Sequence, residues 1–243
     1  MSEKLFVDNV ENLEACVKLA IKYKGLALNF SPDIRFSRKY ADSKTFLDHY
    51  WNQPHLYFNC HILRCPENLT FKTMVNDTSF DYYALYEKAM DSRDYICLPE
   101  IGLFELHTNP DTYLNARANC RHSRNHCGTL AHVASQKRTE ALTHVIVNYN
   151  NEKALNVKPI IYLAYIGLYY NQSWSNNFEF FNSEWENLEC FAYRAWEPGN
   201  PKRSLPYTNT SCVALTVNRT WRTVKCDIKL PYICEIMTSC QKK

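Results

Sequence analysis

Cysteine content constrains the fold of this chain more than any other feature, because its 243 residues include eleven cysteines. No two of them form a CxxC pair, the spacing typical of zinc ribbons and thioredoxin-like redox sites. Scattered cysteines without metal-ligand spacing favour disulfides, which persist in oxidising compartments. Since eleven is odd, one cysteine must be free or bridge to another chain. Either Cys240 is that spare cysteine, or Cys240 pairs internally and another is left over.

Glycosylation sequons point to the same compartment. Six N-x-S/T sequons without a central proline occur, at Asn29, Asn68, Asn76, Asn171, Asn209 and Asn218. One sequon in an Asn-rich chain arises easily by chance, but six sequons combined with eleven cysteines are hard to dismiss. We therefore expect a secreted protein or a receptor ectodomain. The chain opens Met-Ser-Glu-Lys without an apolar segment, so we expect that a secretion signal was removed or never present.

The charge balance argues against two classes of partner. Lys and Arg exceed Asp and Glu by only 28 − 25 = 3, and no block of like charge occurs. Neither nucleic acid nor an anionic membrane surface is therefore the expected partner. No stretch approaches the ~18 apolar residues of a membrane-spanning helix, so we expect no membrane insertion of this chain. Hydrophobic residues make up 46% of the chain, enough for one large domain or two small ones.

The first segment, residues 1–92, begins with a predicted amphipathic helix. Asp8 and Glu11 have the spacing of a capping box, in which two side chains satisfy backbone N–H groups at a helix start. The apolar residues that follow have helical spacing: Leu13, Cys16, Val17, Ala20 and Ile21. Gly25 is expected to cap the end of this helix.

Strands are predicted after this helix, at residues 26–30 and 55–63, with a short helix at residues 45–51 between them. Cys16 lies on the apolar face of the first helix, and Cys60 lies in the second strand. We therefore expect a Cys16–Cys60 disulfide that joins the helix to the sheet.

This order of features resembles a PAN/apple domain. The resemblance covers residues 1–92 and includes the cysteine-bearing helix, the strand Cys60-His-Ile-Leu63 and the closing Phe80-Asp-Tyr-Tyr83. A second cysteine that usually follows the helix in this family is replaced here by Lys24-Gly25-Leu26. The resemblance implies a small α+β domain that binds proteins or sugars without catalysis.

The second segment, residues 95–240, is predicted to alternate helices and short strands. An apolar lead at residues 101–104 precedes a helix at residues 112–120, and Ser135 is a candidate N-cap of a second helix. A buried strand is expected at residues 165–168, followed by an irregular loop that begins at Trp196. Short strands are then expected around Cys212, Trp221 and Tyr232.

Five motifs of this segment, in this order, resemble the C-type lectin-like domain. They are Cys127-Gly128-Thr-Leu-Ala131, Tyr165-Ile-Gly-Leu168, the loop from Trp196, the series Cys212, Trp221 and Cys226, and Tyr232-Ile-Cys234-Glu235. The resemblance implies an α+β, disulfide-rich C-type lectin-like fold for residues 95–240, after the smaller PAN/apple-like α+β domain. It also implies a Cys120–Cys234 disulfide that closes the domain and a Cys212–Cys226 disulfide that pins the last strands.

Several cysteines depart from the family pattern. Cys127 replaces the first glycine of its motif, so a pairing with Cys190 across the long-loop region is a further expectation. Cys65 and Cys97 are left either to join the two domains or to pair with Cys240. Geometry rather than sequence decides between these alternatives.

The resemblance also locates a calcium–sugar site, but its ligands are displaced here. The family takes its Ca²⁺ ligands from a Glu-Pro-Asn or Gln-Pro-Asp triplet, a Glu ahead of a cysteine, and a Trp-Asn-Asp. These positions read Asn200-Pro201-Lys202, Thr210-Ser211 before Cys212, and Trp221-Arg222-Thr223. Calcium requires six to eight oxygens and considerable negative charge, and two of these residues are cationic. We therefore expect no calcium site and no other cofactor.

The long-loop region nevertheless has the composition of a binding surface, because aromatic residues and arginines anchor protein interfaces. The candidate ligand-binding residues are Trp174, Trp185, Arg194, Trp196, Asn200, Lys202, Arg203 and Arg222. The alternative is that Trp196 and several other aromatics pack a small core of the loop itself. No G-x-S-x-G, HExxH or phosphate-loop motif occurs, so no catalytic residue is predicted.

The function that these observations favour is extracellular recognition without catalysis. We expect calcium-independent binding of a protein or glycoprotein partner through the long-loop surface. One alternative is a lectin with a non-standard sugar site. Another is a structural part of an extracellular assembly, linked through the unpaired cysteine.

Overall fold

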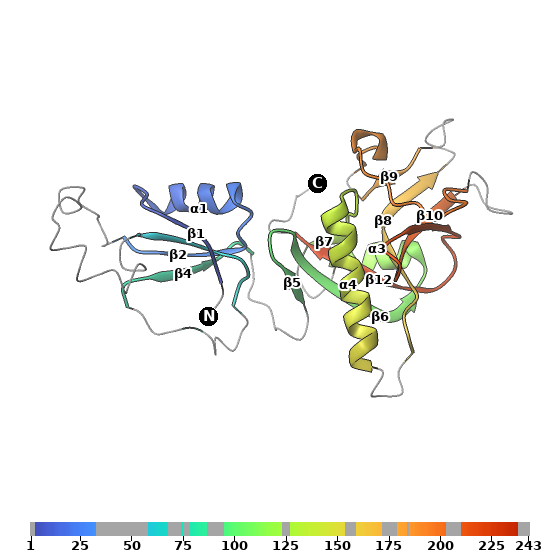
Figure 1. Ribbon diagram of the computed structural model, residues 1–243, viewed down its shortest axis with the longest axis horizontal. Helices are drawn as coiled ribbons and strands as arrows, with labels where there is room; N and C mark the ends of the chain where they lie inside the picture. Colours follow the sequence, from blue (N-terminus) through green and yellow to red (C-terminus); the bar gives the residue numbers. More distant parts are fainter. Residues whose placement is uncertain are drawn as a thin grey trace. The chain divides into compact units, whose positions relative to one another are not determined.

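The computed structural model describes residues 3–32, 58–67, 74, 78–86, 95–122, 127–153, 159–171, 179–183, 185–202 and 210–237. The chain divides into two compact units, one of residues 1–93 and 97–102 and one of residues 94–96 and 103–243 (Figure 1). The helix predicted at residues 45–51 lies outside the described residues. Within the described ranges, no helix is long and apolar enough to cross a membrane.

The described residues of the N-terminal unit form a four-stranded antiparallel sheet and a helix. Its strands lie in the order β1 (Lys4–Asp8), β3 (Cys60–Leu63), β2 (Ala27–Phe30) and β4 (Asp81–Ala84). Helix α1 (Leu13–Lys22) lies along one face of this sheet (Figure 1). The helix and sheet enclose a core of buried side chains, namely Cys16, Ala20, Leu28, Phe30, Cys60 and Ile62. Within it, the predicted Cys16–Cys60 disulfide is confirmed.

The predicted N-cap of α1 is wrong, and the predicted C-terminal cap is only partly right, because the Gly25 N–H donates to the Ala20 carbonyl at 2.8 Å but Gly25 is not the left-handed residue. The N-cap is Asn12, whose side-chain oxygen accepts the N–H of Ala15 at 2.9 Å, because Asp8 belongs to strand β1, which was not predicted. At the other end, Lys24 takes the left-handed conformation, with a φ of 57°. Gly25 is required instead for close packing, since a Cβ there would lie 2.2 Å from the Ile62 Cγ2.

In its described part, the C-terminal unit has two α-helices, a short 3-10 helix and strands of an eight-stranded sheet, whose edge strand β5 (Ile96–Leu98) has only Ile96 in this unit. Its helices are α3 (Tyr113–His122), α4 (Gln136–Lys153) and η4 (Leu188–Cys190). Its strands are β5 (Ile96–Leu98), β6 (Gly102–Asp111), β7 (Gly128–Leu130), β8 (Leu163–Asn171), β9 (Phe181–Asn182), β10 (Thr210–Thr216), β11 (Trp221–Val224) and β12 (Leu230–Ile236). The sheet follows the order β11-β10-β8-β12-β6-β5, with β7 paired to β12 and β9 to β8. The fold class is therefore α+β, as predicted.

Helix starts in this unit follow the sequence signals. The predicted N-cap Ser135 accepts the N–H of Arg138 at 3.2 Å at the start of α4. In β8, Gly167 allows a close approach, since a Cβ there would lie 2.4 Å from the Leu130 carbonyl oxygen. This contact explains why the Tyr165-Ile-Gly-Leu168 motif needs glycine.

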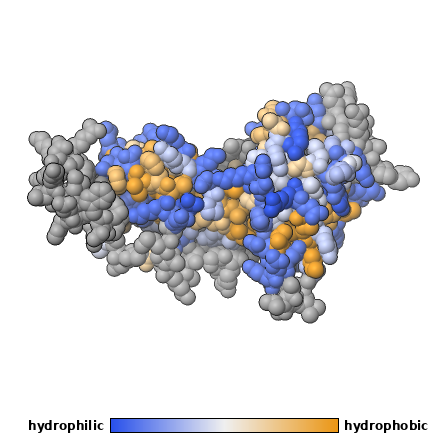
Figure 2. Space-filling view, viewed as in Figure 1, coloured by the Kyte–Doolittle hydropathy of each residue, from blue (hydrophilic) through white to orange (hydrophobic). Residues whose placement is uncertain are grey.

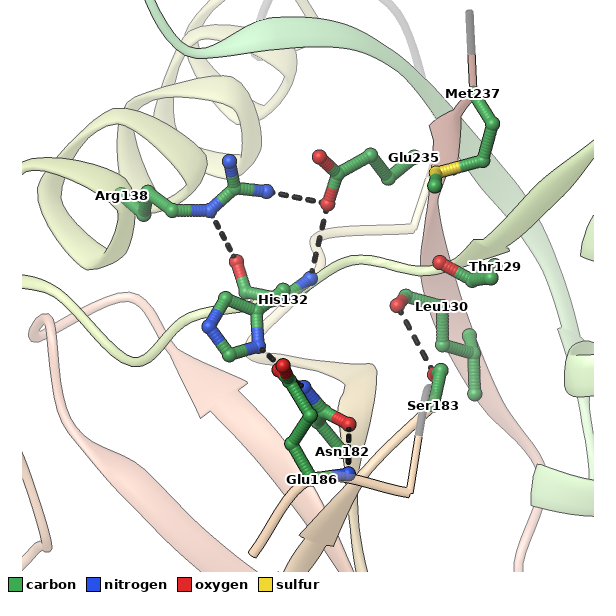
Figure 3. A pocket seen from close by; sticks show the side chains of 9 residues that line it. All are labelled: Thr129, Leu130, His132, Arg138, Asn182, Ser183, Glu186, Glu235 and Met237. Carbon is green, nitrogen blue, oxygen red and sulfur yellow. Dashed lines mark hydrogen bonds and ion pairs between the residues drawn. The ribbon is translucent and has the colours of Figure 1, made fainter. Parts of the chain in front are cut away.

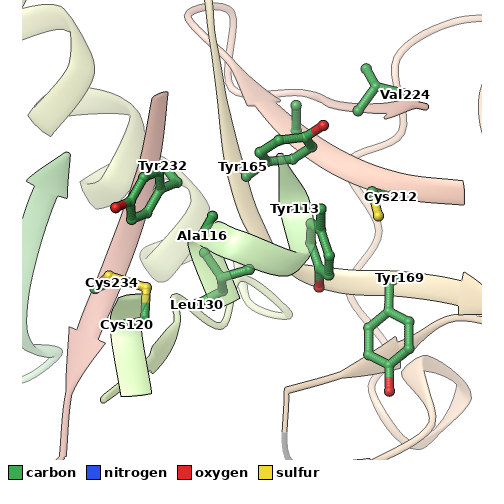
Figure 4. Close-up of a cluster of buried hydrophobic side chains, with 11 residues drawn as sticks. Tyr113, Ala116, Cys120, Leu130, Tyr165, Tyr169, Cys212, Val224, Tyr232 and Cys234 are labelled. Atoms are coloured by element: carbon green, nitrogen blue, oxygen red, sulfur yellow. A yellow bond between two sulfur atoms is a disulfide. The ribbon is translucent and has the colours of Figure 1, made fainter. Parts of the chain in front are cut away.

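Tyrosines dominate the core between α3 and the sheet (Figure 4). The Tyr113 ring meets Tyr165 edge-on at 5.4 Å between centroids and lies 5.9 Å from Tyr169. The Tyr165 hydroxyl lies 2.9 Å from the Lys225 carbonyl and 2.8 Å from the Ile228 carbonyl. The core thus fixes the turn between β11 and β12 as well as the helix.

Most of the predicted disulfides are present in the structure. Cys120–Cys234 and Cys212–Cys226 are both present, and Cys65 bonds to Cys97 within the N-terminal unit. The expected Cys127–Cys190 bridge is wrong: Cys127 is disulfide-bonded, whereas Cys190 is an exposed free thiol at the end of η4. Cys127 directly precedes strand β7, and the pairing of β7 with β12 sets the position of Cys127.

Hydrophilic and hydrophobic residues are interspersed on the face of both units seen in Figure 2. Some large apolar side chains of the described residues remain exposed. They are Ile21, Met74, Ile96, Leu114, Ile160, Tyr162, Trp185 and Ile228. Most are isolated along the chain, but Leu114 and Trp185 border one group of basic and aromatic side chains, which is described below.

Candidate functional site

The predicted long loop packs onto the edge strand β11. Residues 195–197 pair with Trp221: the Trp221 N–H donates to the Ala195 carbonyl at 2.7 Å, and the Glu197 N–H to the Trp221 carbonyl at 2.9 Å. The Trp196 ring lies 5.0 Å from Phe180 and 5.5 Å from the fully buried Trp221. Trp196 is therefore a packing residue of the loop's own core, the alternative that the sequence left open.

An ion pair links the loop to the sheet directly after this core. The Arg222 guanidinium binds the Glu197 carboxylate with two hydrogen bonds, Nε to Oε2 at 2.5 Å and Nη2 to Oε1 at 2.7 Å. Hydrogen bonding to Arg222 lowers the pKa of Glu197, and the same bonds raise the pKa of Arg222. The Arg222 side chain keeps 44% of its surface exposed, so it also faces solvent.

Asn200 and Thr223 form a second link between loop and sheet. The Asn200 Oδ1 accepts the Thr223 hydroxyl at 2.6 Å and the Thr223 N–H at 3.0 Å. The Thr223 hydroxyl in turn accepts the Lys202 N–H at 3.1 Å. These residues occupy the triplet and Trp-Asn-Asp positions of the family pattern. The structure therefore brings Trp196, Asn200, Lys202 and Arg222 together.

The remaining predicted residues are placed differently. The Arg194 guanidinium folds back onto the Phe191 and Tyr193 carbonyls, at 2.5 and 2.9 Å, and onto the Glu189 carboxylate at 3.0 Å. Trp185 has other ring neighbours than Trp196, because it lies beside Tyr169 and Arg117. The candidates Trp174 and Arg203 lie outside the described residues.

The predicted glycosylation sites also differ in their surroundings. Asn218 is exposed in the turn between β10 and β11. Asn29 lies in the sheet strand β2, and the serine of its sequon, Ser31, is fully buried. Asn171 ends strand β8. Asn68, Asn76 and Asn209 lie outside the described residues.

Sequence reasoning missed a polar pocket of ≈ 150 Å³ at the N-terminus of α4 (Figure 3). The Arg138 guanidinium pairs with Glu235 and donates to the His132 carbonyl at 2.7 Å. Asn182 lies 3.5 Å from the His132 Nδ1 and donates to Glu186 at 2.8 Å. Burial lowers the pKa of His132. No local pattern could have found this pocket, since His132 and Glu235 are 103 residues apart.

Metal-binding groups are absent from the part of the chain that the structure describes. No group of three or more His, Cys, Asp or Glu side chains there could hold a metal ion. The carboxylates nearest the family's calcium positions are already engaged, as the Glu197–Arg222 pair shows.

Several solved structures are similar to part of this chain. Human lithostathine is 19% identical over 54% of this chain and 81% of its own, with a TM-score of 0.41. The carbohydrate-recognition domain of cow CD23 is 19% identical over 60% and 95%, with a TM-score of 0.45. A calcium-independent type II antifreeze protein is 16% identical over 63% and 100%, with a TM-score of 0.44. No curated protein matches the sequence.

A family model gives the assignment. The Lectin C-type domain model matches residues 109–236, which include α3, α4 and the strands from β7 to β12. This match spans more than half of the chain, and it covers the two predicted disulfides and the whole described long loop. The chain therefore belongs to the C-type lectin domain family.

Proposed function

We propose that this protein is an extracellular recognition module that binds a protein or glycoprotein partner without calcium. Domains of its family are generally binding modules rather than enzymes, which agrees with the lack of a catalytic motif. The proposed contact is the long-loop surface, defined as residues 191–202 together with β11. The observation that carries the proposal is the internal pairing of the polar side chains at the family's calcium positions.

Calcium does not fit these residues. The side-chain oxygen of Asn200 already accepts hydrogen bonds from the N–H and the hydroxyl of Thr223, and Thr223 is itself 95% buried. A Ca²⁺ ion needs six to eight oxygens with negative charge among them. The carboxylate of Glu197 is neutralised by Arg222, and the Lys202 ammonium adds a further positive charge. Binding a cation here would break several internal bonds and place it beside two cationic side chains.

The same bonds give the surface a fixed shape. The Trp196–Trp221 backbone pairing, the Glu197–Arg222 pair and the Asn200–Thr223 pair all tie the loop to β11. A preorganised surface loses little conformational entropy when it binds. Exposed Lys202 then offers a positive group to a partner, and the half-exposed Arg222 offers the N–H donors that Glu197 does not use.

Disulfides support an extracellular location. Four disulfides join described cysteines, two in each unit. Such a density is typical of secreted domains, because cytosolic thiols are kept reduced. The exposed sequon at Asn218 fits the same location.

A glycan array and a pull-down with the glycosylated protein, each with calcium and with EDTA, test this proposal. We expect partner capture to be equal in both buffers and to fall with Lys202→Glu. The matched control is Lys229→Glu, an exposed lysine in the turn after β11. Loss of binding in EDTA would overturn calcium independence, and equal effects of both variants would reject the long-loop surface. Sugar binding that survives EDTA would favour the non-standard lectin instead.

The N-terminal unit supports a PAN/apple-like assignment as a second part of the proposal. The cysteine-bearing helix α1 is bonded through Cys16 to the central strand β3, and both elements belong to the pattern that carries that resemblance. The unit also has its own buried core. Limited proteolysis tests its independence: a resistant fragment that contains Cys65 and Cys97 is expected, and simultaneous digestion of both units would contradict it.

A further inference from the structure

One group of side chains in the C-terminal unit is unused by the long-loop surface. The Arg117 guanidinium carbon lies 5.2 Å from the ring centroid of Tyr169 and 5.2 Å from that of Trp185. Tyr169 is buried, whereas Trp185 keeps 45% of its surface exposed. The two rings contact each other edge-on, with 6.0 Å between their centroids, and Arg117 lies beside both of them.

The backbone holds Trp185 in place. The Trp185 N–H donates to the Asn182 carbonyl at 3.1 Å, and the Asn182 side chain accepts the Glu186 N–H at 2.9 Å. Trp185 itself has a φ of 70°, in the left-handed region that a bulky residue rarely adopts. The turn therefore fixes a large apolar side chain at the surface despite a backbone cost of about 1 kcal/mol.

Positive charge gathers beside this ring. Arg121 lies one helical turn after Arg117 on α3, so about 6 Å separates the two positions along the helix axis. Burial raises the pKa of the Tyr169 hydroxyl, and the charges of Arg117 and Arg121 oppose that rise, so both arginines act near the same ring. Exposed Leu114 lies on the same face of the helix as these arginines.

These charges have no acidic counterpart in the described structure. Helix α3 contains no Asp or Glu, and neither Arg117 nor Arg121 forms an ion pair with a described residue. Guanidinium groups bind sulfate-like and carboxylate groups with paired, charge-assisted hydrogen bonds. An anionic ligand would supply the acidic counterpart.

We propose that Trp185, Arg117 and Arg121 form a binding site for an anionic glycan, a sugar chain that carries sulfate or carboxylate groups. The exposed indole offers the negative face of its π-system to the C–H groups of a sugar ring. The two arginines bind acidic groups that the glycan carries next to that sugar ring. This site lies on α3 and on the turn after β9, so it does not depend on the long-loop surface.

Binding to immobilised protein, measured in low and high salt, tests the site with four probes. Heparin carries sulfate, polygalacturonate carries only carboxylate, dextran is neutral, and polyglutamate is an acidic peptide. Heparin is expected to bind most tightly and to weaken as salt screens the charges. Binding by polygalacturonate as well would assign the recognition to acidic groups in general, and dextran is expected not to bind.

Variants locate the contact on the protein. Arg121→Gln and Trp185→Ala are each expected to weaken heparin binding about tenfold, the loss of one charge-assisted contact or one stacked ring. Trp185→Phe keeps a ring and is expected to lose less, and it also guards against a misfolded alanine variant. The exposed lysine in Lys229→Gln is the matched control and should change affinity by no more than about twofold. Lys202→Gln, on the long-loop surface, distinguishes the two surfaces.

Four results would overturn the proposal. They are no binding of either anionic glycan, equal losses in the Lys229→Gln control, a loss confined to Lys202→Gln, and polyglutamate binding as tight as heparin. The last result would identify the surface as a site for acidic peptides. If only Lys202→Gln weakens heparin binding, the site lies on the long-loop surface. If only Arg121→Gln and Trp185→Ala weaken it, the site lies on α3 and the turn after β9, as proposed.

Discussion

Arg222 and Glu197 meet through two parallel hydrogen bonds, although 25 residues separate them in the chain. This pair ties the long loop to the sheet where the family pattern has calcium ligands. The loop is therefore held to the sheet by a cation that belongs to the chain itself, the Arg222 guanidinium.

The first prediction concerns this ion pair. Glu197→Gln should lower the free energy of unfolding at neutral pH by about 1 kcal/mol or less, because the pair is partly exposed. Since the Glu197 pKa is lowered in the fold, its contribution is present above the ordinary carboxyl pKa and is lost as the pH falls through the folded pKa. The difference between wild type and variant, measured by urea denaturation, should shrink on acidification. Glu152→Gln, on an exposed carboxylate of α4, is the control and should show no such trend.

The second prediction concerns Asn200. Asn200→Ala leaves both buried donors of Thr223 without an acceptor and should cost about 1–3 kcal/mol of stability. Asn200→Asp retains the acceptor oxygens and should cost less. Urea denaturation of both variants measures the difference. Equal losses would mean that the Asn200–Thr223 bonds do not stabilise the loop.

The third prediction concerns the free thiol. Native protein treated with iodoacetamide at mildly alkaline pH should be labelled at Cys190, because this side chain is exposed and unbonded. Peptide mapping identifies the site, and Cys190→Ser should abolish the label. Labelling of Cys127 instead would contradict the disulfide assignment.

A non-reducing gel extends this test to covalent assembly. A dimer band that disappears with Cys190→Ser would support the disulfide-linked assembly among the alternative functions. A purely monomeric band would exclude assembly through this thiol.

The fourth prediction compares the two disulfides of the lectin domain. Cys120–Cys234 closes a sequence separation of 114 residues and Cys212–Cys226 one of 14. In the chain-entropy model the longer loop contributes about 5 kcal/mol and the shorter about 3 kcal/mol. Paired alanine substitutions should therefore destabilise the protein more at the first disulfide, as measured by urea denaturation. Equal effects would favour an enthalpic origin for the stabilisation.

The fifth prediction concerns His132. Because burial lowers its pKa below the ordinary value of 6.5, the unfolded chain binds a proton more readily than the folded chain. Stability should thus be complete above that value and fall as the pH drops below it. The positive charge of Arg138 also lowers the His132 pKa, whereas the negative charges of Glu235 and Glu186 raise it. His132→Gln should flatten this part of the stability profile, and His144→Gln, an exposed control on α4, should not.

Motifs with fixed spacing predicted the frame of the lectin domain well. The helix at residues 112–120, the N-cap at Ser135 and the three closing strands all appear in the structure. The pairing of Cys120 with Cys234 followed from the family resemblance. These features are local or belong to the family pattern, so a single sequence reveals them.

Features that depend on contacts between distant residues could not be predicted from the sequence. Trp185 and Trp196 are eleven positions apart in one aromatic-rich region, yet they have different ring neighbours. The path of the chain between them decides which ring each tryptophan meets. Similarly, Asn12 displaced the predicted cap because Asp8 pairs with Cys60 in the sheet, a contact across more than fifty residues.

The position of β12 has a consequence for biosynthesis. This strand pairs with β6, β7 and β8, so the sheet is incomplete until residues 230–236 have left the ribosome. At about 5–20 residues per second, Cys120 emerges roughly 6–23 s before its partner Cys234. During that interval its thiol meets the cysteines between them, including Cys127 and Cys190. A bond between Cys120 and one of them would have to exchange before the sheet can close, so the yield of correctly folded protein should depend on the isomerase capacity of the cell that makes it.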